Sequence, residues 1–292
     1  VDGSGGAELY AAPTRGGRVF RGNGPLSAEG AVESDYVLGA DGRSVYFRQT
    51  IAAGTVELFR GSVVGRSPDR LCAPHAVGSA VQEFAVAPDH VVYRADSRAN
   101  NVVELFVAPA DASADPERVP LDLPVNADVH AFALSEDASR IVFLADGATA
   151  FKLELYSAPI DAQSFVRLNQ DLDSSEDVSD FQVTPDSSAV VFRANPDGGT
   201  NRELFLAPID GSSPARRLGP DLPAEERVSS LYLLRDASVL YGLTRAADWQ
   251  AQVVSLDVGA QPVPFGPPAF AERDTFATSA HFLCMTDAGL LS

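Results

Sequence analysis

An acid and a base bracket the stretch DFQVTPDSSAVVFR, which begins at Asp180 and ends at Arg193. Held close together, a carboxylate and a guanidinium could work as a pair in an active site, or bind a polar ligand through the planar fork of the arginine. The same residues could equally be the two ends of a β-hairpin, because TPDS in the middle is typical of a tight turn. The choice depends on the elements that carry the two side chains.

The chain consists of six copies of one sequence unit. The triplet ELY or ELF recurs at steps of 49, 47, 50 and 49 residues, and a degenerate QVV follows after another 49. A turn aspartate recurs in step with it, in segments such as GADG, APDH and TPDS. The two series are Glu8, Glu57, Glu104, Glu154, Glu203 and Gln252, and Asp41, Asp89, Asp137, Asp186, Asp236 and Asp287.

Each copy contains four short segments of strand character, exemplified by DFQVT, AVVFR, ELFLAP and ARRL. No window of ten or more residues has a convincing helical period. Four antiparallel strands repeated at about 49 residues predict an all-β fold, a six-bladed β-propeller in which neighbouring blades bury each other's faces. We expect a single domain over residues 1–292, with full blades starting near residues 33, 81, 129, 178 and 228.

The two ends of the chain are expected to close the ring. The first ELY precedes the first turn aspartate, and no ELY follows the last turn aspartate. Residues near 279–292 should therefore supply the inner two strands of one blade, and residues near 7–21 its outer two. Hydrogen bonds between these segments would leave no free sheet edge.

The acid and the arginine vary together from copy to copy. Aligned on the turn aspartate, the two positions hold Asp35 and Arg48, Glu83 and Arg94, Ala131 and Leu144, Asp180 and Arg193, and Ser230 and Gly242. Three copies have both charges and two have neither. Each pair is symmetric about its turn, so the side chains should face each other across the first two strands. Joint loss avoids leaving one charge stranded, which favours a structural pair.

A functional role for these pairs stays open, because the strand ends that carry them should lie at one mouth of the central channel. Two histidines, His130 and His281, also fall at the start of innermost strands. With Glu33 and Glu83 they could support acid–base chemistry or half of a metal site. The four histidines have neither His-x-His nor His-x3-His spacing, so we expect a polar lining with no catalytic residue, metal or cofactor. The candidate ligand-binding residues at the mouth are Asp35, Arg48, Glu83, Arg94, His130, Asp180, Arg193 and His281.

The loops that lead into the inner strands are acidic, as in SAEGAVE, VNAD, SSED and AEER. The whole chain has 40 acids, 22 Lys and Arg, and a formal charge of −18. A negative mouth favours a basic protein or peptide partner, and the alternative is an acidic surface that serves solubility. Nucleic acid and anionic membrane surfaces are disfavoured, and no apolar run is long enough to insert into a bilayer.

Two further features bear on the setting of the protein. Cys72 and Cys284 lie 212 positions apart without metal-ligand spacing, so we expect two buried, unpaired thiols. The chain opens VDGSGGAELY, without a Met or an apolar leader, so we expect a processed form or a fragment.

APDH and TPDS, followed about 15 residues later by ELF and AP(I/A)D, resemble the PD40, or TolB-like, six-bladed propeller repeat, in six copies over essentially the whole chain. The resemblance implies a scaffold of the cell envelope (periplasm) or a secreted protein. The same repeat serves in the gating propellers of prolyl-oligopeptidase-type enzymes and in some polysaccharide lyases. Trp-Asp strand ends and a GxSxG elbow are both absent.

We therefore expect a non-enzymatic propeller that binds a protein or another ligand at the acidic mouth of its channel. Two alternatives stay open: an enzyme working at the channel mouth, either a lyase or a hydrolase, and a regulatory propeller detached from a larger protein.

Overall fold

The computed structural model of the protein describes residues 6–52, 54–74, 77–96, 102–124, 126–147, 152–171, 177–195, 201–223, 225–235, 238–245, 248–264, 285–286 and 289–290. Every regular element in this part of the chain is a β-strand. The strands form five four-stranded and two two-stranded antiparallel sheets. The described part has no apolar helix of membrane-spanning length.

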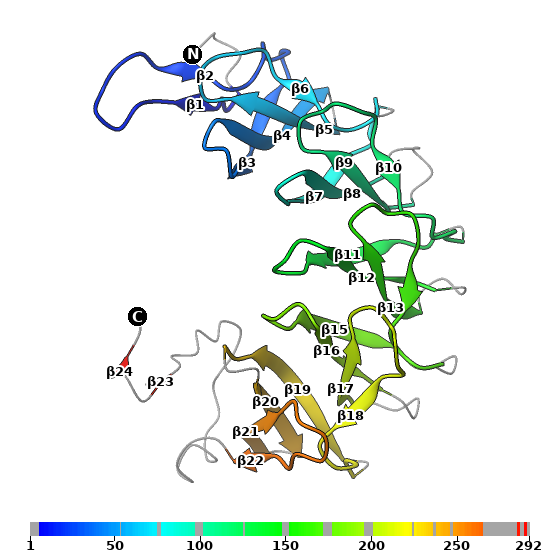
Figure 1. Ribbon diagram of the computed structural model, residues 1–292. Coiled ribbons are helices and arrows are strands. Elements are labelled where there is room, and N and C mark those ends of the chain that lie inside the picture. The colour runs from blue at the N-terminus through cyan, green and yellow to red at the C-terminus, as the bar shows by residue number, and fades with distance from the viewer. Residues whose placement is uncertain are drawn as a thin grey trace.

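Each four-stranded sheet is one blade, and its strands follow chain order from the innermost to the outermost (Figure 1). The five blades are blade 1, with β3 (Ala31–Leu38), β4 (Ser44–Ala52), β5 (Thr55–Ser62) and β6 (Asp69–Arg70); blade 2, with β7 (Val81–Val86), β8 (His90–Ala95), β9 (Glu104–Pro109) and β10 (Glu117–Arg118); blade 3, with β11 (Val129–Leu134), β12 (Arg140–Asp146), β13 (Leu153–Pro159) and β14 (Val166–Arg167); blade 4, with β15 (Val178–Val183), β16 (Ala189–Ala194), β17 (Glu203–Pro208) and β18 (Arg216–Leu218); and blade 5, with β19 (Glu226–Leu233), β20 (Ser238–Arg245), β21 (Asp248–Ser255) and β22 (Val263–Pro264).

The blades stand side by side in an arc, with their innermost strands facing a central hollow (Figure 1). We call the end of the blades where the innermost strands begin the mouth end. The loops from the fourth strand of one blade to the first strand of the next, which we call the mouth loops, lie at this end. The turn between the first and second strands and the turn between the third and fourth lie at the opposite end. This all-β arrangement is the predicted propeller.

The two-stranded sheets lie in the segments that the sequence assigns to a sixth blade. They are β1 (Tyr10–Ala11) with β2 (Phe20–Arg21), and β23 (Met285–Thr286) with β24 (Gly289–Leu290). Met285 pairs with Leu290 across the turn between β23 and β24. Thr184 and Ala189, which bond across the first turn of blade 4, have the same separation in sequence. No pairing joins the two sheets within the described ranges, and closure of the ring by strand pairing stays a prediction.

Aromatic stacking fixes the second and third strands of blades 1 to 4 against each other. In each of these blades a ring on the second strand lies 5.2–5.9 Å from a ring on the third, with interplanar angles of 14–21°. The stacked pairs are Phe47 with Phe59, Tyr93 with Phe106, Phe143 with Tyr156, and Phe192 with Phe205.

The hydrophobic core runs between blades rather than within one. Leu144 and Leu155 of blade 3, for example, share a cluster with Val178 and Phe192 of blade 4. A single blade would expose both faces of its sheet to water, so the blades stabilise one another as repeat proteins do.

Three of the recurring turn aspartates form Asx turns. Oδ1 of Asp41, Asp137 and Asp186 accepts the backbone N–H two residues on, at 2.8, 3.0 and 3.1 Å. Each aspartate is followed by a residue with positive φ: Gly42, Ala138 and Ser187, at 62°, 56° and 60°. The sequence motif therefore reports a backbone requirement at the end of the blade away from the mouth.

These turns make stability depend on pH. The backbone N–H groups of Ser44 and Arg43 lower the pKa of Asp41 from 3.8 to about 2, and the hydroxyl of Ser135 is the main cause of a similar lowering for Asp137. Because the folded pKa lies below the unfolded value, the stabilisation is complete above pH 3.8 and is lost as the pH falls toward 2.

The Asp41→Asn/Asp137→Asn variant should therefore be less stable than the wild type to urea at about pH 5, and should lose less stability than the wild type on acidification to about pH 2.5. Equal losses in the two proteins would contradict a role for these carboxylates.

Candidate functional site

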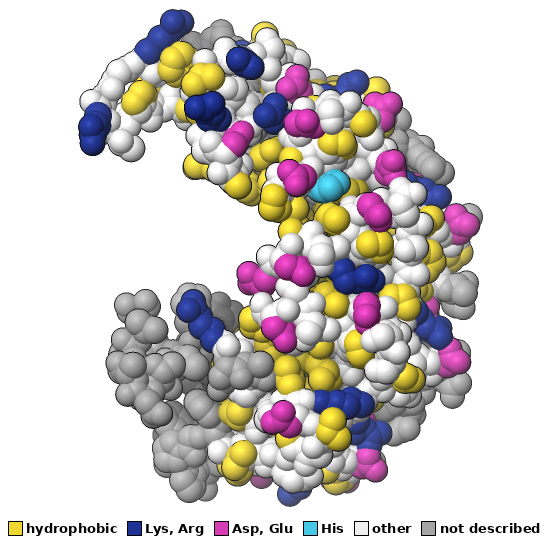
Figure 2. Space-filling view, viewed as in Figure 1, with side chains coloured by type: hydrophobic (Ala, Val, Ile, Leu, Met, Phe, Trp, Pro, Cys, Tyr) yellow, Lys and Arg dark blue, Asp and Glu magenta, His cyan; other side chains and the backbone are white. Residues whose placement is uncertain are grey.

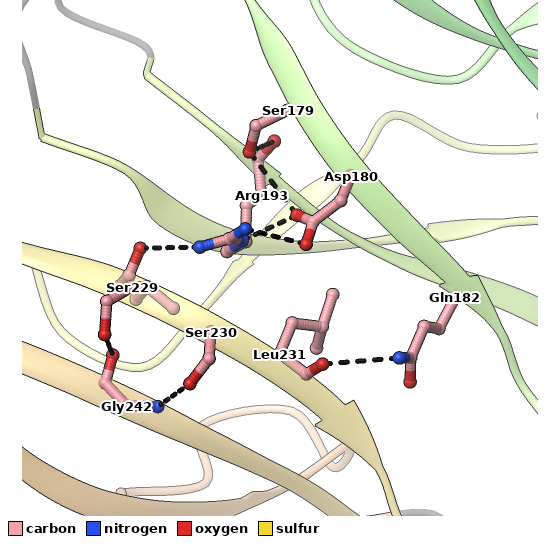
Figure 3. Close-up of polar contacts among 9 residues, drawn as sticks. Ser179, Asp180, Gln182, Arg193, Ser229, Ser230, Leu231 and Gly242 are labelled. Carbon is pink, nitrogen blue, oxygen red and sulfur yellow. Dashed lines mark hydrogen bonds and ion pairs between the residues drawn. The ribbon is translucent and has the colours of Figure 1, made fainter. Parts of the chain in front are cut away.

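The acid and the arginine at the ends of the opening stretch meet. Asp180 of β15 lies directly opposite Arg193 of β16. Nε of Arg193 donates to Oδ1 of Asp180 at 2.6 Å, and Nη2 donates to Oδ2 at 2.7 Å, so the pair is bidentate (Figure 3). The predicted facing pair is confirmed.

The other copies follow the same rule. Arg94 Nε lies 2.9 Å from Glu83 Oε2, and Arg48 Nε lies 2.8 Å from Asp35 Oδ2. The two uncharged copies also face each other, Ala131 opposite Leu144 and Ser230 opposite Gly242. The acid and arginine columns of the sequence are therefore cross-strand neighbours in all five blades.

In each of the five described blades a β-bulge or register irregularity lies at or just before the acid position. In blades 2 to 5 the register shifts by one residue there, and the extra residues are Gln82, His130, Ser179 and Ser229. In blade 1 the shift lies between Val32 and Tyr36. A bulge bends its strand and re-aims the following side chain, which here brings the acid opposite the arginine.

Each arginine also reaches the next blade. Nη1 of Arg48 donates to the carbonyls of Val81 and Gln82, at 2.9 and 2.7 Å. Nη1 of Arg94 donates to the carbonyl of Val129 at 3.3 Å. Nη1 of Arg193 donates to the carbonyl of Val228 at 3.1 Å, next to Ser229 in Figure 3. These carbonyls begin the innermost strand of the following blade, so the guanidinium fastens two blades together.

This use of the arginines limits what they can bind. The arginine side chains are 15–21% exposed, whereas their acids are 40–46% exposed. In each pair the acid and the next blade's carbonyl occupy donor groups on both sides of the guanidinium. A carboxylate ligand would have to displace one of these partners, so the arrangement acts first as a clamp between blades.

Where the charges are missing, other contacts fill the space. Leu144 is 5% exposed and packs in the cluster with Val178 of blade 4. In blade 5 a Cβ at Gly242 would lie 2.5 Å from Nε1 of Trp249 and 2.7 Å from Oγ of Ser230. The indole therefore occupies the space that the arginine side chain takes in blades 1, 2 and 4.

His130 contacts a buried carboxylate. Its Nε2 lies 3.1 Å from Oδ2 of Asp146, whose side chain is 2% exposed. The same oxygen accepts the backbone N–H of Asp128 at 2.7 Å. In blade 4 Oδ1 of Asn195 accepts the backbone N–H of Asp177 at 2.6 Å. A neutral amide therefore has the same structural role there as Asp146 has in blade 3.

The other predicted acid–base and metal candidates do not gather around His130. Glu33 accepts a hydrogen bond from the hydroxyl of Thr50 at 2.7 Å, and Glu83 is paired with Arg94. His281 lies outside the described residues. Within the described ranges no three His, Cys, Asp or Glu side chains come together as a possible metal site.

The acids of the mouth loops divide into two groups. Three that the sequence assigns to a negative surface are engaged in the fold: Asp128 and Asp177 accept the N–H groups of Val103 and Leu153, and Glu226 is 4% exposed and paired with Arg245. Others in the same loops are open to solvent. These exposed acids are Glu29, Asp122, Asp171, Asp221 and Glu225.

The side chains of Asp122, Asp171 and Asp221 are 96%, 94% and 89% exposed. Each lies four residues after an arginine and pairs with it at the surface. Acidic side chains also line the inner rim of the hollow on the face seen in Figure 2.

Sequence reasoning missed the arginine partner of the ELF and ELY glutamates. Each glutamate side chain, 4–8% exposed, pairs with an arginine on the fourth strand 13 or 14 residues later, at 2.8–3.5 Å. The pairs are Glu8 with Arg21, Glu57 with Arg70, Glu104 with Arg118, Glu154 with Arg167, and Glu203 with Arg217. The constant spacing between each glutamate and its arginine could have revealed these pairs from the sequence alone.

The sequence series assigns Gln252 to the glutamate position of blade 5, and this assignment is wrong. Glu203 lies opposite Ala194 in blade 4, and the equivalent residue opposite Leu243 in blade 5 is Gln250, not Gln252. The residue 14 positions after Gln250 is Pro264, so blade 5 has lost the buried glutamate and its arginine together.

Cys72 is a free, buried thiol, as predicted, and Cys284 lies outside the described residues. Burial raises the pKa of Cys72 to about 12. The backbone N–H of Leu58 donates to its sulfur at 3.3 Å, where the equivalent Leu155 donates to Oδ1 of Asn169 at 2.7 Å. The thiol replaces an amide acceptor and is not a reactive site.

No protein-family model and no curated protein matches the chain. Solved structures are similar at low identity. Prolyl oligopeptidase B from Galerina marginata, bound to a 35mer substrate, is 11% identical with a TM-score of 0.57, over 82% of this chain and 38% of that one. A puromycin-hydrolyzing peptidase from Mycobacterium tuberculosis is 11% identical with a TM-score of 0.51, over 78% and 38%. A putative TolB from Agrobacterium tumefaciens is 17% identical with a TM-score of 0.45, over 88% and 86%.

The likeness to the two peptidases shows a shared fold, and the chain spans 38% of their length.

The clamp has a direct test in a double-mutant cycle. Asp180→Ala should lower the free energy of unfolding by about 1–3 kcal/mol, because it leaves the mostly buried Arg193 without its anion. Asp180→Ala with Arg193→Leu copies Ala131 and Leu144 of blade 3 and should cost less than the single change. Denaturant unfolding of the four proteins measures the coupling. If the losses of unfolding free energy in Asp180→Ala and Arg193→Leu add up in the double variant, the two side chains act independently.

Proposed function

We propose that the protein is a non-enzymatic binding propeller whose mouth loops receive a basic protein or peptide. One observation carries the proposal: the exposed acids Glu29, Asp122, Asp171, Asp221 and Glu225 all belong to loops at the same end of the blades. A cationic partner that meets this end is attracted by several carboxylates at once.

The charge of the mouth loops is one-sided. Residues 121–128, 170–177 and 220–226 contain nine acids and no Lys or Arg. With a formal charge of −18 on the chain, this distribution speeds the encounter with a basic partner and repels acidic ones. A setting in the cell envelope or outside the cell belongs to the same proposal and rests on the resemblance of the repeat.

A second candidate is a regulatory propeller of a larger protein. The fold shared with 38% of the length of two peptidases favours it. Reading the gene on both sides of residues 1–292 tests this candidate, because a hydrolase domain in the same reading frame would establish it and a reading frame without one would remove it.

Neutralising the mouth should weaken binding more than neutralising the other end. The mouth variant is Asp122→Asn/Asp171→Asn/Asp221→Asn, and the probe is a fluorescent decapeptide of alternating Lys and Thr. The three aspartates form only exposed ion pairs, so the fold should tolerate their loss. We expect the dissociation constant from fluorescence anisotropy to rise about 3- to 10-fold, and wild-type binding to weaken as salt is raised.

The matched control removes three charges at the opposite end, in Asp111→Asn/Asp161→Asn/Asp210→Asn. These aspartates accept backbone N–H groups in the turns between third and fourth strands, and asparagine keeps that acceptor. Equal weakening in the two triple variants would show that only net charge matters and would overturn a site at the mouth.

A further inference from the structure

Four exposed arginines lie in turns at the end of the blades opposite the mouth. Arg15 and Arg18 belong to the turn between β1 and β2, Arg43 to the turn between β3 and β4, and Arg66 to the turn between β5 and β6. Within the described ranges none of these four side chains has an acidic partner. The arginines of the clamps and of the fourth strands, in contrast, are each paired with an acid.

An aromatic ring joins the β1–β2 turn to blade 1. The guanidinium carbon of Arg18 lies 5.4 Å from the ring centroid of Phe20. The same ring lies against Gly65, where an added Cβ would come within 2.8 Å of it. Arg66 directly follows Gly65, so Arg18 and Arg66 flank one contact between the two turns.

The turn that carries Arg43 borders the same surface, because the N–H of Val63 donates to the carbonyl of Arg43 at 2.9 Å. Figure 2 shows the dark blue side chains gathered at this end of the arc. Two acids lie among them: Asp41 accepts the backbone N–H of Arg43, and Asp69 pairs with Arg60 at 3.6 Å. A surplus of positive charge remains. We call this surface the arginine face, and its members are Arg15, Arg18, Arg43 and Arg66.

The same end of blades 2 to 4 has the opposite charge. Its turns carry the exposed acids Asp89, Asp111, Glu136, Asp137, Asp161, Asp186 and Asp210. A nucleic acid or an anionic bilayer that extended over several blades would meet these acids and be repelled. A short anionic segment can bind the arginine face alone.

We propose that the arginine face binds a short acidic segment of a protein partner. The inference goes beyond the proposed function, because it concerns the opposite end of the blades and a partner of opposite charge. Guanidinium groups bind carboxylates through two parallel hydrogen bonds. Val19 and Val64 lie in the same turns and are each 54% exposed, so apolar side chains between the acids of the segment also find contacts.

Removing two charges from the arginine face should weaken the binding of an acidic peptide. The variant is Arg43→Gln/Arg66→Gln, and the probe is a fluorescent decapeptide of alternating Glu and Thr. Both side chains are exposed and form no ion pair within the described ranges, so the fold should tolerate the change. We expect the dissociation constant from fluorescence anisotropy at low salt to rise about 3- to 10-fold, and wild-type binding to weaken as salt is raised.

The matched control is Arg227→Gln/Arg235→Gln in blade 5. These arginines are also exposed and without an acidic partner in the described part of the chain, so the two variants have the same net charge. The control should change the dissociation constant less than about twofold. Equal weakening in the two variants would show that only net charge matters and would overturn the proposal, as would absence of wild-type binding at low salt.

Two further measurements identify the occupant. Pentathymidylate with a 5′ phosphate matches the peptide in its number of anionic groups, and we expect it to bind wild type more weakly than the peptide does. Tighter binding that the Arg43→Gln/Arg66→Gln change weakens would make the face a phosphate site and overturn an acidic protein segment. Sedimentation velocity at low salt should give the same oligomeric state for wild type and variant. A wild-type dimer that the variant dissociates would make the occupant a second copy of the chain and overturn a separate partner.

Discussion

The free edge of each innermost strand is the constraint on which the rest of the structure depends. A strand at the end of a sheet has N–H and C=O groups that its own blade cannot pair, and in a propeller every blade has such a strand beside the channel. The preceding blade supplies the missing donors through Arg48, Arg94 and Arg193. Because a guanidinium has a fixed length, these bonds also set the distance and orientation between neighbouring blades.

The acids follow from this use of arginine. A guanidinium only 15–21% exposed is poorly solvated, so it needs an anion as well as a carbonyl acceptor. The bulge before the acid position brings the carboxylate opposite the arginine, and the clamp is complete only with both. A blade without the clamp must use a different contact: Leu144 packs against the next blade, and Gly242 makes room for Trp249. The charges are therefore kept or lost as a pair.

The sequence predicts what the chain determines locally. Strand order, the Asx turns and the facing of Asp180 and Arg193 all depend on a turn and a two-residue period, and these are correct. The reach of Arg193 to Val228 was not foreseen, because it depends on which blade is the neighbour in space. The sequence also does not show which acids are exposed to solvent. Asp128 and Asp122 belong to one loop, yet Asp128 accepts the N–H of Val103 and Asp122 is 96% exposed. The partners of the ELF glutamates were readable from a constant spacing, and the error at Gln252 came from a loop two residues shorter in blade 5.

At the mouth end the three charged pairs present their carboxylates to solvent more than their guanidinium groups. The arginines are engaged with acids and carbonyls, so a zwitterionic or anionic ligand finds few donors among the three charged pairs. The acids are different, because carboxylates 40–46% exposed and the more exposed aspartates of the mouth loops can still accept hydrogen bonds.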